Sequence, residues 1–481
     1  MAESVGRFGF RWSYGAVLAV TVVLAGFMSA PSGRAAQRPE TLWTSAVTID
    51  RQATEFESER VARVVSSQAG DRLVAIWSGA GYASDDFDAS GWARTLRSSF
   101  SDDAGRSWSQ PQDISPRDGY VGRFGVAEEA LTASDHGRKI FATWVQQDAG
   151  ITGARVAVAR STDYGRTWRS PIILAGQVAY APKIFTSGNG KRAVVTWGTC
   201  RKARDVCAGL HLEVSRSVDG GRSWSEPRRI GAATPNSGGT QFWDTAASHD
   251  ARRVTAIWTR GSHRLLSTTS NTSGRTWTDA TVISRGYSVA PDIVMSADGA
   301  AATAVWFTQQ HIKTAQMRWG NAWRNPSVLT TPGAPSGAFD VVVSGDGNRA
   351  VVVIEAADAQ RRPTGTRIWA ATRDRSDWSP VRAVSTGSRS PDHRLGQVVA
   401  SADARVITAI WSSRTGLGAT SSGTYGRSWG TSKALPAHFE LGWERSGLGV
   451  DSDRSGKRLI AVCRDGAAPE TTFASSGRVR G

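Results

Sequence analysis

The sequence predicts an all-β fold, a β-propeller of eight four-stranded antiparallel blades closed by an N-terminal strand. A short motif ending in Trp recurs along the chain, and a strand pattern ending in Trp recurs in phase with it. The composition agrees, because 51 Gly and 20 Trp but only 4 Met among 481 residues favour short strands and tight turns. Repeats that pack on their neighbours also allow a chain of this length to form one domain.

The recurring motif is Ser-x-Asp/Thr-x-Gly-x-x-Trp. It spans residues 101–108, 161–168, 217–224, 270–277 and 422–429, and two degenerate copies end in Trp323 and Trp378. Ser and Asp side chains at this spacing accept N–H groups inside a turn, and Gly supplies a positive φ. The Trp ring that follows is expected between sheets. We therefore expect these aspartates to be structural and not catalytic.

The other strands of the repeat follow in a fixed order. An alternating second strand ends at Trp77, Trp144, Trp197, Trp258, Trp306, Ile354, Trp411 and Cys463. Only seven outer strands follow these eight, so the segment from Trp43 to Ile49 is expected to supply the missing one. It should pair with the strands around Leu448, Ala461 and Thr472, which removes exposed sheet edges.

The N-terminus has the pattern of an export signal. Arg7 and Arg11 precede an apolar stretch, and Gly33-Arg34-Ala35 fits a cleavage site after residue 35. We expect a signal peptide at 1–35, a linker at 36–40, the propeller at 41–473 and a tail at 474–481. The mature protein would be secreted or bound to the cell surface without a membrane span, the alternative being an uncleaved anchor.

Cysteine spacing fits an oxidising compartment. Cys200 and Cys207 flank a short loop, and we expect a disulfide between them. Cys463 is expected outside this bridge, as a buried small hydrophobic residue.

The repeated motif resembles the Asp box, or BNR repeat, of sialidases and related propellers, over roughly residues 41–473. The resemblance implies that each box joins the third and fourth strands of a blade. It also implies that the Asp boxes lie on one face of the ring. Ligands would then bind on the opposite face, where the inner strands begin.

The candidate ligand site follows from this geometry. Four residues before the turn that ends each inner strand lie Arg63, Ala130, Lys183, Asp244, Asp292, Asp340, Gln397 and Leu448. The predicted ligand-binding residues are Arg63, Lys183, Asp244, Asp292 and Asp340, with the aromatic residues Trp243 and Tyr287 in adjacent loops. The alternative is a hydrated channel whose charges neutralise each other, with the aromatic rings packed between blades.

An acidic loop offers a candidate catalytic residue. The loop after Trp77 contains Asp85, Asp86 and Asp88, and the resemblance implies that Asp85 or Asp86 would protonate a leaving group. Arg63 would then bind a substrate carboxylate. The alternative is a flexible acidic loop or a weak Ca²⁺ site.

Three features depart from sialidases. Arg63 is followed by Val64-Val65 in place of Ile-Pro, and the last tyrosine, Tyr425, lies inside an Asp box, so a late-blade nucleophile is missing. The predicted eight blades also differ from the six of sialidases.

Three functions remain open from the sequence. The first is binding of a glycan or another polar or anionic surface polymer; the second is exo-acting glycoside hydrolysis; the third is a scaffold for another exported protein. The formal net charge of +16 favours an anionic partner, although the arginines are spread over all repeats, as on a solvated surface. No zinc-finger or helix-turn-helix spacing indicates nucleic acid, no motif indicates a cofactor or metal, and we expect a monomer.

Overall fold

The computed structural model describes most of the predicted propeller. The described residues are 40–52, 62–79, 95–116, 119–121, 130–148, 154–175, 178–203, 206–232, 242–261, 263–358, 365–375, 377–385, 392–413, 416–436, 448–465 and 470–480. None of them belongs to a helix that is long and apolar enough to cross a lipid bilayer.

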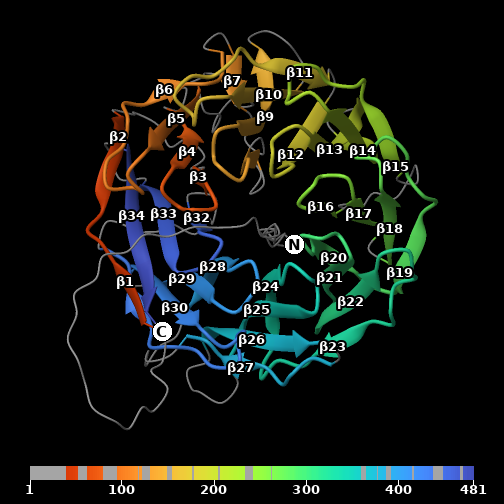
Figure 1. Cartoon of the computed structure of the whole chain (residues 1–481). Helices are drawn as coiled ribbons and strands as arrows, with labels where there is room; N and C mark the ends of the chain where they lie inside the picture. Colours follow the sequence, from red (N-terminus) through yellow and green to blue (C-terminus); the bar gives the residue numbers. More distant parts are fainter. Residues whose placement is uncertain are drawn as a thin grey trace, which may run out of the picture.

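The strands form eight sheets arranged as the blades of a ring, which confirms the predicted fold (Figure 1). Blade 1 contains β3 (Ala62–Ser66), β4 (Leu73–Ser78), β5 (Leu96–Ser101) and β6 (Gln112–Asp113). Blade 2 contains β7 (Gly119–Val121), β8 (Leu131–Ala133), β9 (Ile140–Asp148), β10 (Arg155–Ser161) and β11 (Ile172–Ala175). Blade 3 contains β12 (Val178–Thr186), β13 (Ala193–Ala203), β14 (Val206–Ser217) and β15 (Arg228–Ala232).

Blades 4 to 7 repeat the same antiparallel order. Blade 4 contains β16 (Trp243–Ala247), β17 (Val254–Thr259), β18 (Arg264–Ser270) and β19 (Thr281–Arg285). Blade 5 contains β20 (Val289–Met295), β21 (Ala301–Phe307), β22 (Ile312–Arg318) and β23 (Ser327–Leu329). Blade 6 contains β24 (Pro335–Val343), β25 (Arg349–Ala357), β26 (Thr366–Asp374) and β27 (Arg382–Ala383). Blade 7 contains β28 (Arg394–Ala400), β29 (Ile407–Ser413), β30 (Gly416–Ser422) and β31 (Lys433–Ala434).

Blade 8 joins the two ends of the described chain, as the sequence predicts. It contains β32 (Leu448–Ser452), β33 (Arg458–Asp465), β34 (Glu470–Arg480), β1 (Glu40–Trp43) and β2 (Val47–Gln52). β1 and β2 both pair with β34, with Trp43 opposite Gly477. Because β34 has partners on both sides, it continues to Arg480, through residues that the sequence interpretation assigned to a tail.

The inner turns, which join the first and second strands of each blade, form a closed ring of backbone hydrogen bonds. In each bond a backbone N–H of one blade donates to a backbone C=O of the next. The pairs, donor first, are Gln68 to Asp135, Asp135 to Gly188, Gly188 to His249, His249 to Ala297, Asp298 to Gly345, Gly345 to Ala402, Ala402 to Arg454 and Arg454 to Gln68. The N–O distances run from 2.7 to 3.3 Å. Every blade therefore contacts the next through its main chain, including blade 8 to blade 1.

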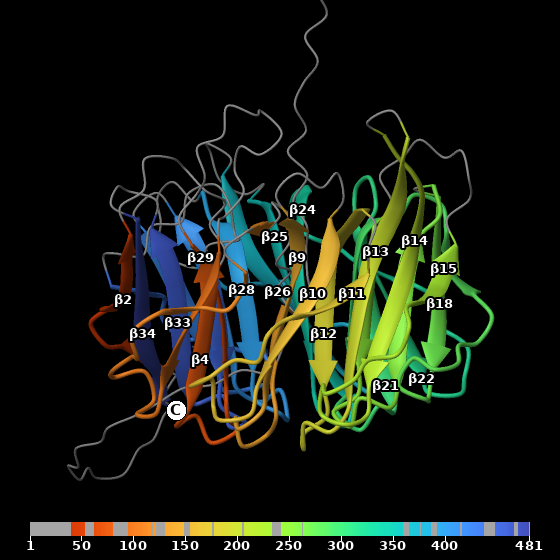
Figure 2. The same cartoon turned by 90° about the horizontal axis from the view of Figure 1, so that it is seen from above.

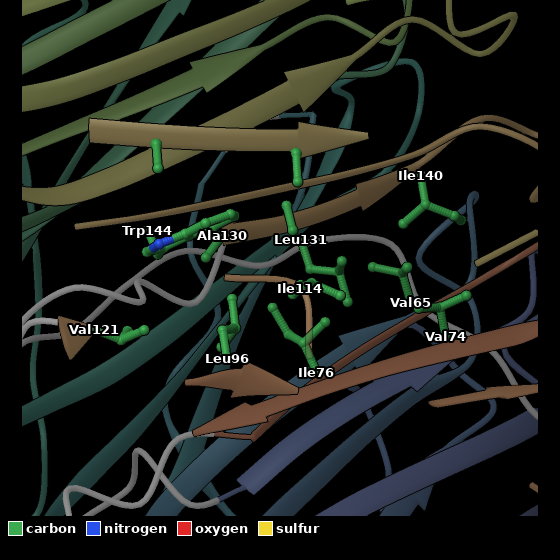
Figure 3. Close-up of a cluster of buried hydrophobic side chains, with 13 residues drawn as sticks. Val65, Val74, Ile76, Leu96, Ile114, Val121, Ala130, Leu131, Ile140 and Trp144 are labelled. Carbon is green, nitrogen blue, oxygen red and sulfur yellow. The ribbon is translucent and has the colours of Figure 1, made fainter. Parts of the chain in front are cut away.

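The hydrophobic core lies between blades and not within one layer. Figure 3 shows one such cluster, in which Ile76 and Leu96 of blade 1 pack toward Leu131 and Trp144 of blade 2. Trp144 is fully buried, and so are the equivalent Trp77, Trp197 and Trp306. The repeated second-strand Trp thus fills the gap between neighbouring sheets.

The Asp boxes form the expected turns. In blade 1, the Asp103 carboxylate accepts hydrogen bonds from Ser101 Oγ at 2.8 Å and from Ser107 N at 2.9 Å, while Gly105 N donates to Ser101 Oγ at 2.8 Å. Gly105 has a φ of 83°, and the preceding Ala104 also has a positive φ of 66°, which the sequence analysis did not anticipate. The aspartate is fully occupied inside its own turn, as a structural role requires.

The cysteine predictions are only partly within the described structure. The side chains of Cys200 and Cys207 lie outside the described residues, so their disulfide stays a prediction. Cys463 is buried in β33 and belongs to the core of blades 7 and 8, as expected.

Candidate functional site

The inner ring is defined by Arg63, Ala130, Lys183, Asp244, Asp292, Asp340, Gln397 and Leu448. It lies along the inner strands, beyond the inner turns and the Asp boxes. Each Asp box contacts the inner turn of its own blade; Ala104 N, for example, donates to Asp71 O at 3.0 Å. The strands run along the ring axis (Figure 2), and several residues of the inner ring lie about midway along them, four residues before the inner turns. The two faces of the propeller therefore carry different groups.

A buried ion pair joins blades 3 and 4 in the inner ring. Lys183 Nζ contacts the Asp244 carboxylate, and both side chains are fully buried. Asp244 Oδ2 also accepts a hydrogen bond from Ile293 N of blade 5 at 2.8 Å. Burial of these charges is tolerable because each is paired and hydrogen-bonded. The sequence analysis expected them around an open mouth, whereas the structure places them below the surface.

Other members of the inner ring hold neighbouring inner strands in the same way. Asp340 Oδ2 accepts from Val398 N at 2.8 Å, and the Gln397 side chain bonds both the N–H and the C=O of Val450. Arg63 Nη1 donates to Leu448 O at 3.4 Å. These contacts satisfy main-chain groups on the free edge that each inner strand presents to the channel. Much of the polar character of the ring thus serves to connect blades.

Asp292 differs from its neighbours in the ring. It is fully buried, and no N–H or O–H group of the described residues hydrogen-bonds either carboxylate oxygen. Burial raises the pKa of Asp292 well above its ordinary value, and the nearby carboxylates of Asp244 and Asp340 raise it further. A carboxyl group in this setting favours the protonated form, which can donate a proton or a hydrogen bond.

The two predicted aromatic contacts have different positions. Trp243 is 3% exposed and packs with Tyr180 and Trp258 between blades 3 and 4. Tyr287 is 37% exposed and lies just before β20, at the end of the channel opposite the Asp boxes. Of these two rings, only that of Tyr287 is therefore exposed to a ligand at this end of the channel.

Sequence reasoning missed a polar cluster between blades 6 and 7. Glu355 is fully buried and accepts hydrogen bonds from Leu395 N at 2.8 Å and Arg394 Nη1 at 3.2 Å. Arg367 Nε pairs with Asp358 Oδ2 at 2.8 Å, also buried. His393 lies beside them, and burial followed by the charge of Arg367 lowers its pKa to about 4. The one signal in the sequence is Glu355 itself, a charge at the end of the apolar run Val351–Ile354.

The catalytic prediction lies outside the described structure. Asp85, Asp86 and Asp88 belong to residues 80–94, which are not described. The described residues contain no group of three or more His, Cys, Asp or Glu side chains placed to hold a metal ion.

The channel also contains a cavity at its Asp-box end. It has a volume of about 300 Å³ and is lined by the inner turns and the ends of the inner strands. Ala247, Met295 and Val343 form part of its wall, and His249 contacts Asp135 at 3.1 Å beside it. This cavity lies at the end opposite the predicted ligand site.

Comparisons with known proteins agree with the fold. A model of the BNR repeat-like domain matches residues 32–243. No curated protein sequence matches the chain. The solved Dos1 propeller is similar over 89% of this chain and 95% of its own, with a TM-score of 0.51 and 9% identity.

Two solved glycan-processing enzymes are also similar in structure. The Hadza microbial sialidase Hz136 matches with a TM-score of 0.39 and 16% identity, over 62% of this chain and 63% of its own. The intramolecular trans-sialidase from Ruminococcus gnavus matches with a TM-score of 0.39 and 13% identity, over 66% of this chain and 94% of its own. The chain thus spans less than two thirds of the Hadza sialidase, and at these identities the likeness concerns the fold alone.

Proposed function

We propose that this β-propeller, whose residues 32–243 match the BNR repeat-like domain, is an exported sialidase-like protein that binds a glycan or another polar surface polymer. The proposed site is the end of the channel opposite the Asp boxes. Ligands of propellers and barrels commonly bind where many strands converge, because residues distant in sequence can then surround one small group.

The proposal rests on exposed or partly exposed side chains at the starts of three consecutive inner strands. Tyr287 before β20 and Ser336 in β24 are exposed, and Arg394 in β28 is 33% exposed. An aromatic ring, a hydroxyl and a guanidinium together suit a ligand with a sugar face, hydroxyls and an anionic group. In this proposal Tyr287 and Arg394 contact the ligand.

The buried inner ring would act as the charged floor of this site. Lys183, Asp244, Asp292 and Asp340 lie below the rim, and Arg63 and Trp243 fix the strands that carry it. Their contribution would be the shape and the electrostatic potential of the mouth, since buried dipoles and charges act over several ångströms in a low-dielectric interior.

A group of buried carboxyl side chains supports glycoside hydrolysis as a second candidate function. The raised pKa of Asp292 leaves a proton-bearing carboxyl beside two further carboxylates, Asp244 and Asp340. Glycoside hydrolysis uses a pair of carboxyl groups in different protonation states. In this alternative Asp85 or Asp86 supplies the acid. Of the two carboxyl groups predicted as its partner, Asp292 and Asp340, Asp340 would be the second carboxylate, because a protonated Asp292 cannot act as a base or nucleophile.

A glycan array run beside a panel of fluorogenic glycosides tests both functions. Wild-type protein should retain glycans on the array, and Tyr287→Ala should weaken the best ligand by about 1 kcal/mol, because an aromatic stacking contact is lost. Tyr425→Ala, at an Asp box, is the matched control and should leave the affinity unchanged. Retention of no glycan, or an equal loss in both variants, would refute binding at this end. Turnover that disappears in Asp85→Asn or Asp86→Asn would instead establish the hydrolase.

A further inference from the structure

A groove between blades 2 and 3 lies beside their Asp boxes and belongs to neither end of the channel. Its volume is about 270 Å³. Phe141, Ile172 and Trp224 form apolar parts of its wall, and Ser170 supplies a hydroxyl. Its remaining polar lining is three arginines, Arg160, Arg169 and Arg222.

The arginines come from two blades and are brought together by the Asp-box turns. Arg160 stands at the end of β10, and its Nη1 donates to Gly220 O of blade 3 at 3.2 Å. Arg169 follows the Asp box of blade 2, and its N–H donates to Arg160 O at 2.9 Å. Arg222 follows Gly221 in the Asp box of blade 3. Gly221 has a φ of 77°, and a Cβ at this position would lie 2.5 Å from the Phe141 ring. The main chain therefore fixes where all three side chains begin.

Positive charges outnumber negative ones here, since Asp219 is the one carboxylate of the described structure whose charge acts on Arg160. Among the described residues, none of these three guanidinium groups forms an ion pair with a carboxylate. Burial lowers the pKa of Arg160, and the charges of Arg222 and Arg169 lower it further. The nearby Asp219 is held within its own turn, where its Oδ2 accepts from Ser223 Oγ at 2.6 Å.

The positive surface continues toward the axis. Lys139 Nζ donates to Gly190 O at 3.1 Å, across the gap between blades 2 and 3. Burial lowers the pKa of Lys139, and the charges of Lys191, Arg222, Arg160 and Arg138 lower it further. Mutually repelling cations that are held in place and form no ion pair with a carboxylate make a site that an anion stabilises.

A second groove between blades has no such charge. The groove between blades 4 and 5 has a volume of about 490 Å³ and is lined by Trp277, Trp319 and Trp323, but by no Arg or Lys. Equivalent positions between blades thus need not be basic.

We propose that the groove between blades 2 and 3 binds a sulfate or phosphate ester carried by an acidic polysaccharide. Arg160, Arg169 and Arg222 would donate hydrogen bonds to the ester oxygens, because planar guanidinium groups match oxyanions in a bidentate manner. The Trp224 ring would lie against the sugar. This inference does not depend on the proposed site at the channel mouth.

The test compares four probes by calorimetry or fluorescence titration: dextran sulfate, phosphorylated dextran, unmodified dextran and inorganic sulfate. The double variant Arg169→Gln/Arg222→Gln removes two exposed arginines of the groove. The matched control is Arg106→Gln/Arg275→Gln, which removes two exposed arginines from the Asp boxes of blades 1 and 4 and lowers the net charge equally. Thermal unfolding of each variant checks that the ring is intact.

The expected result is that a charged dextran binds the wild type and that the groove variant loses at least tenfold in affinity, while the control loses less than twofold. The better of the two charged dextrans identifies the ester. Equal losses in both double variants would show general attraction to a basic surface and overturn the site. Binding of inorganic sulfate without either charged dextran, or equal binding of unmodified dextran, would overturn it as well.

Discussion

The buried carboxyl group of Asp292 couples folding to protonation. Its pKa is raised in the folded state, so folding takes up a proton between the unfolded value, about 4, and the raised value. The stability that this group contributes is therefore present at acid pH and is lost as the pH rises through that interval. Asp451, also fully buried, has its pKa raised by burial and acts in the same direction.

Asp292→Asn should therefore stabilise the protein at pH 8 and not at pH 4. Asn keeps the shape and removes the charge, so we expect a gain of about 1–3 kcal/mol in the free energy of unfolding at pH 8. Urea unfolding at the two pH values measures it. Asp358→Asn is the control, since the buried Asp358 is paired with Arg367 at 2.8 Å and its neutralisation should not stabilise the protein. Destabilisation by Asp292→Asn at pH 8 would contradict this account.

Adjacent aspartates in one Asp box should have unequal effects. Asp103→Ala leaves the N–H and hydroxyl of Ser107 without their acceptor, so we expect a loss of about 1–3 kcal/mol. Asp102→Ala removes only exposed ion pairs with Arg72 and Arg166 and should cost about 0–1 kcal/mol. Denaturant unfolding compares the two, and ligand affinity should be unchanged in both. A larger loss for Asp102→Ala would mean that the turn does not depend on its aspartate.

Two glycines separate backbone strain from packing between blades. Gly165 and Gly320 have nearly the same positive φ, 82° and 84°. A Cβ on Gly165 would lie 2.5 Å from Val74 Cγ2 of blade 1, whereas a Cβ on Gly320 would meet nothing within 4 Å. Gly165 therefore marks a close approach of two blades, and Gly320 does not.

Gly320→Ala should cost about 1 kcal/mol through its left-handed backbone alone. Gly165→Ala should cost about 2–4 kcal/mol, because overpacking against Val74 adds to the same strain. Thermal unfolding of both variants measures the difference. Equal destabilisation would show that the blades can move apart at little cost.

At the scale of elements, the repeat explains why so much of the fold follows from the sequence. The Asp-box turn and the second strand ending in Trp depend on residues within a few positions of each other, so their pattern is visible along the chain. The inner-ring contacts join residues about 50 positions apart on different blades, as Asp244 does with Ile293. Their register depends on how the sheets pack, so the sequence suggested a ring of charges but not that Lys183 would be buried with Asp244.

We expect β1 and β2 to contribute much of the stability that the protein gains when the ring closes between blades 8 and 1. Asp50 in β2 accepts hydrogen bonds from Trp77 Nε1 at 2.9 Å and from Arg97 Nη1 at 2.7 Å, so β2 binds blade 1 as well as blade 8. A chain beginning at residue 53 lacks both outer strands of blade 8, and we expect a loss of several kcal/mol and a Tm lower by roughly 10 °C.

Calorimetry of this truncated chain and of a matched chain beginning at residue 40 measures the effect. The longer chain retains β1 and β2 and should melt like the full chain. The same Tm in both truncations would show that the ring does not need its N-terminal strands.

At the scale of the molecule, the propeller presents two unlike faces. The Asp-box end is held by the closed ring of inner turns, and the opposite end gathers the starts of the inner strands above a buried charged floor. The proposed function assigns the ligand to this second end, although a cavity of about 300 Å³ exists at the first. The two ends can be distinguished because different peptides form them.

Hydrogen–deuterium exchange with the tightest non-sulfated glycan found on the array tests this assignment most directly. The account predicts slower exchange in residues 287–295 and 392–398, at the starts of β20 and β28, and no change in residues 134–139 and 187–192 of the inner turns. Protection confined to the inner turns would place the ligand in the Asp-box cavity and contradict the proposed site.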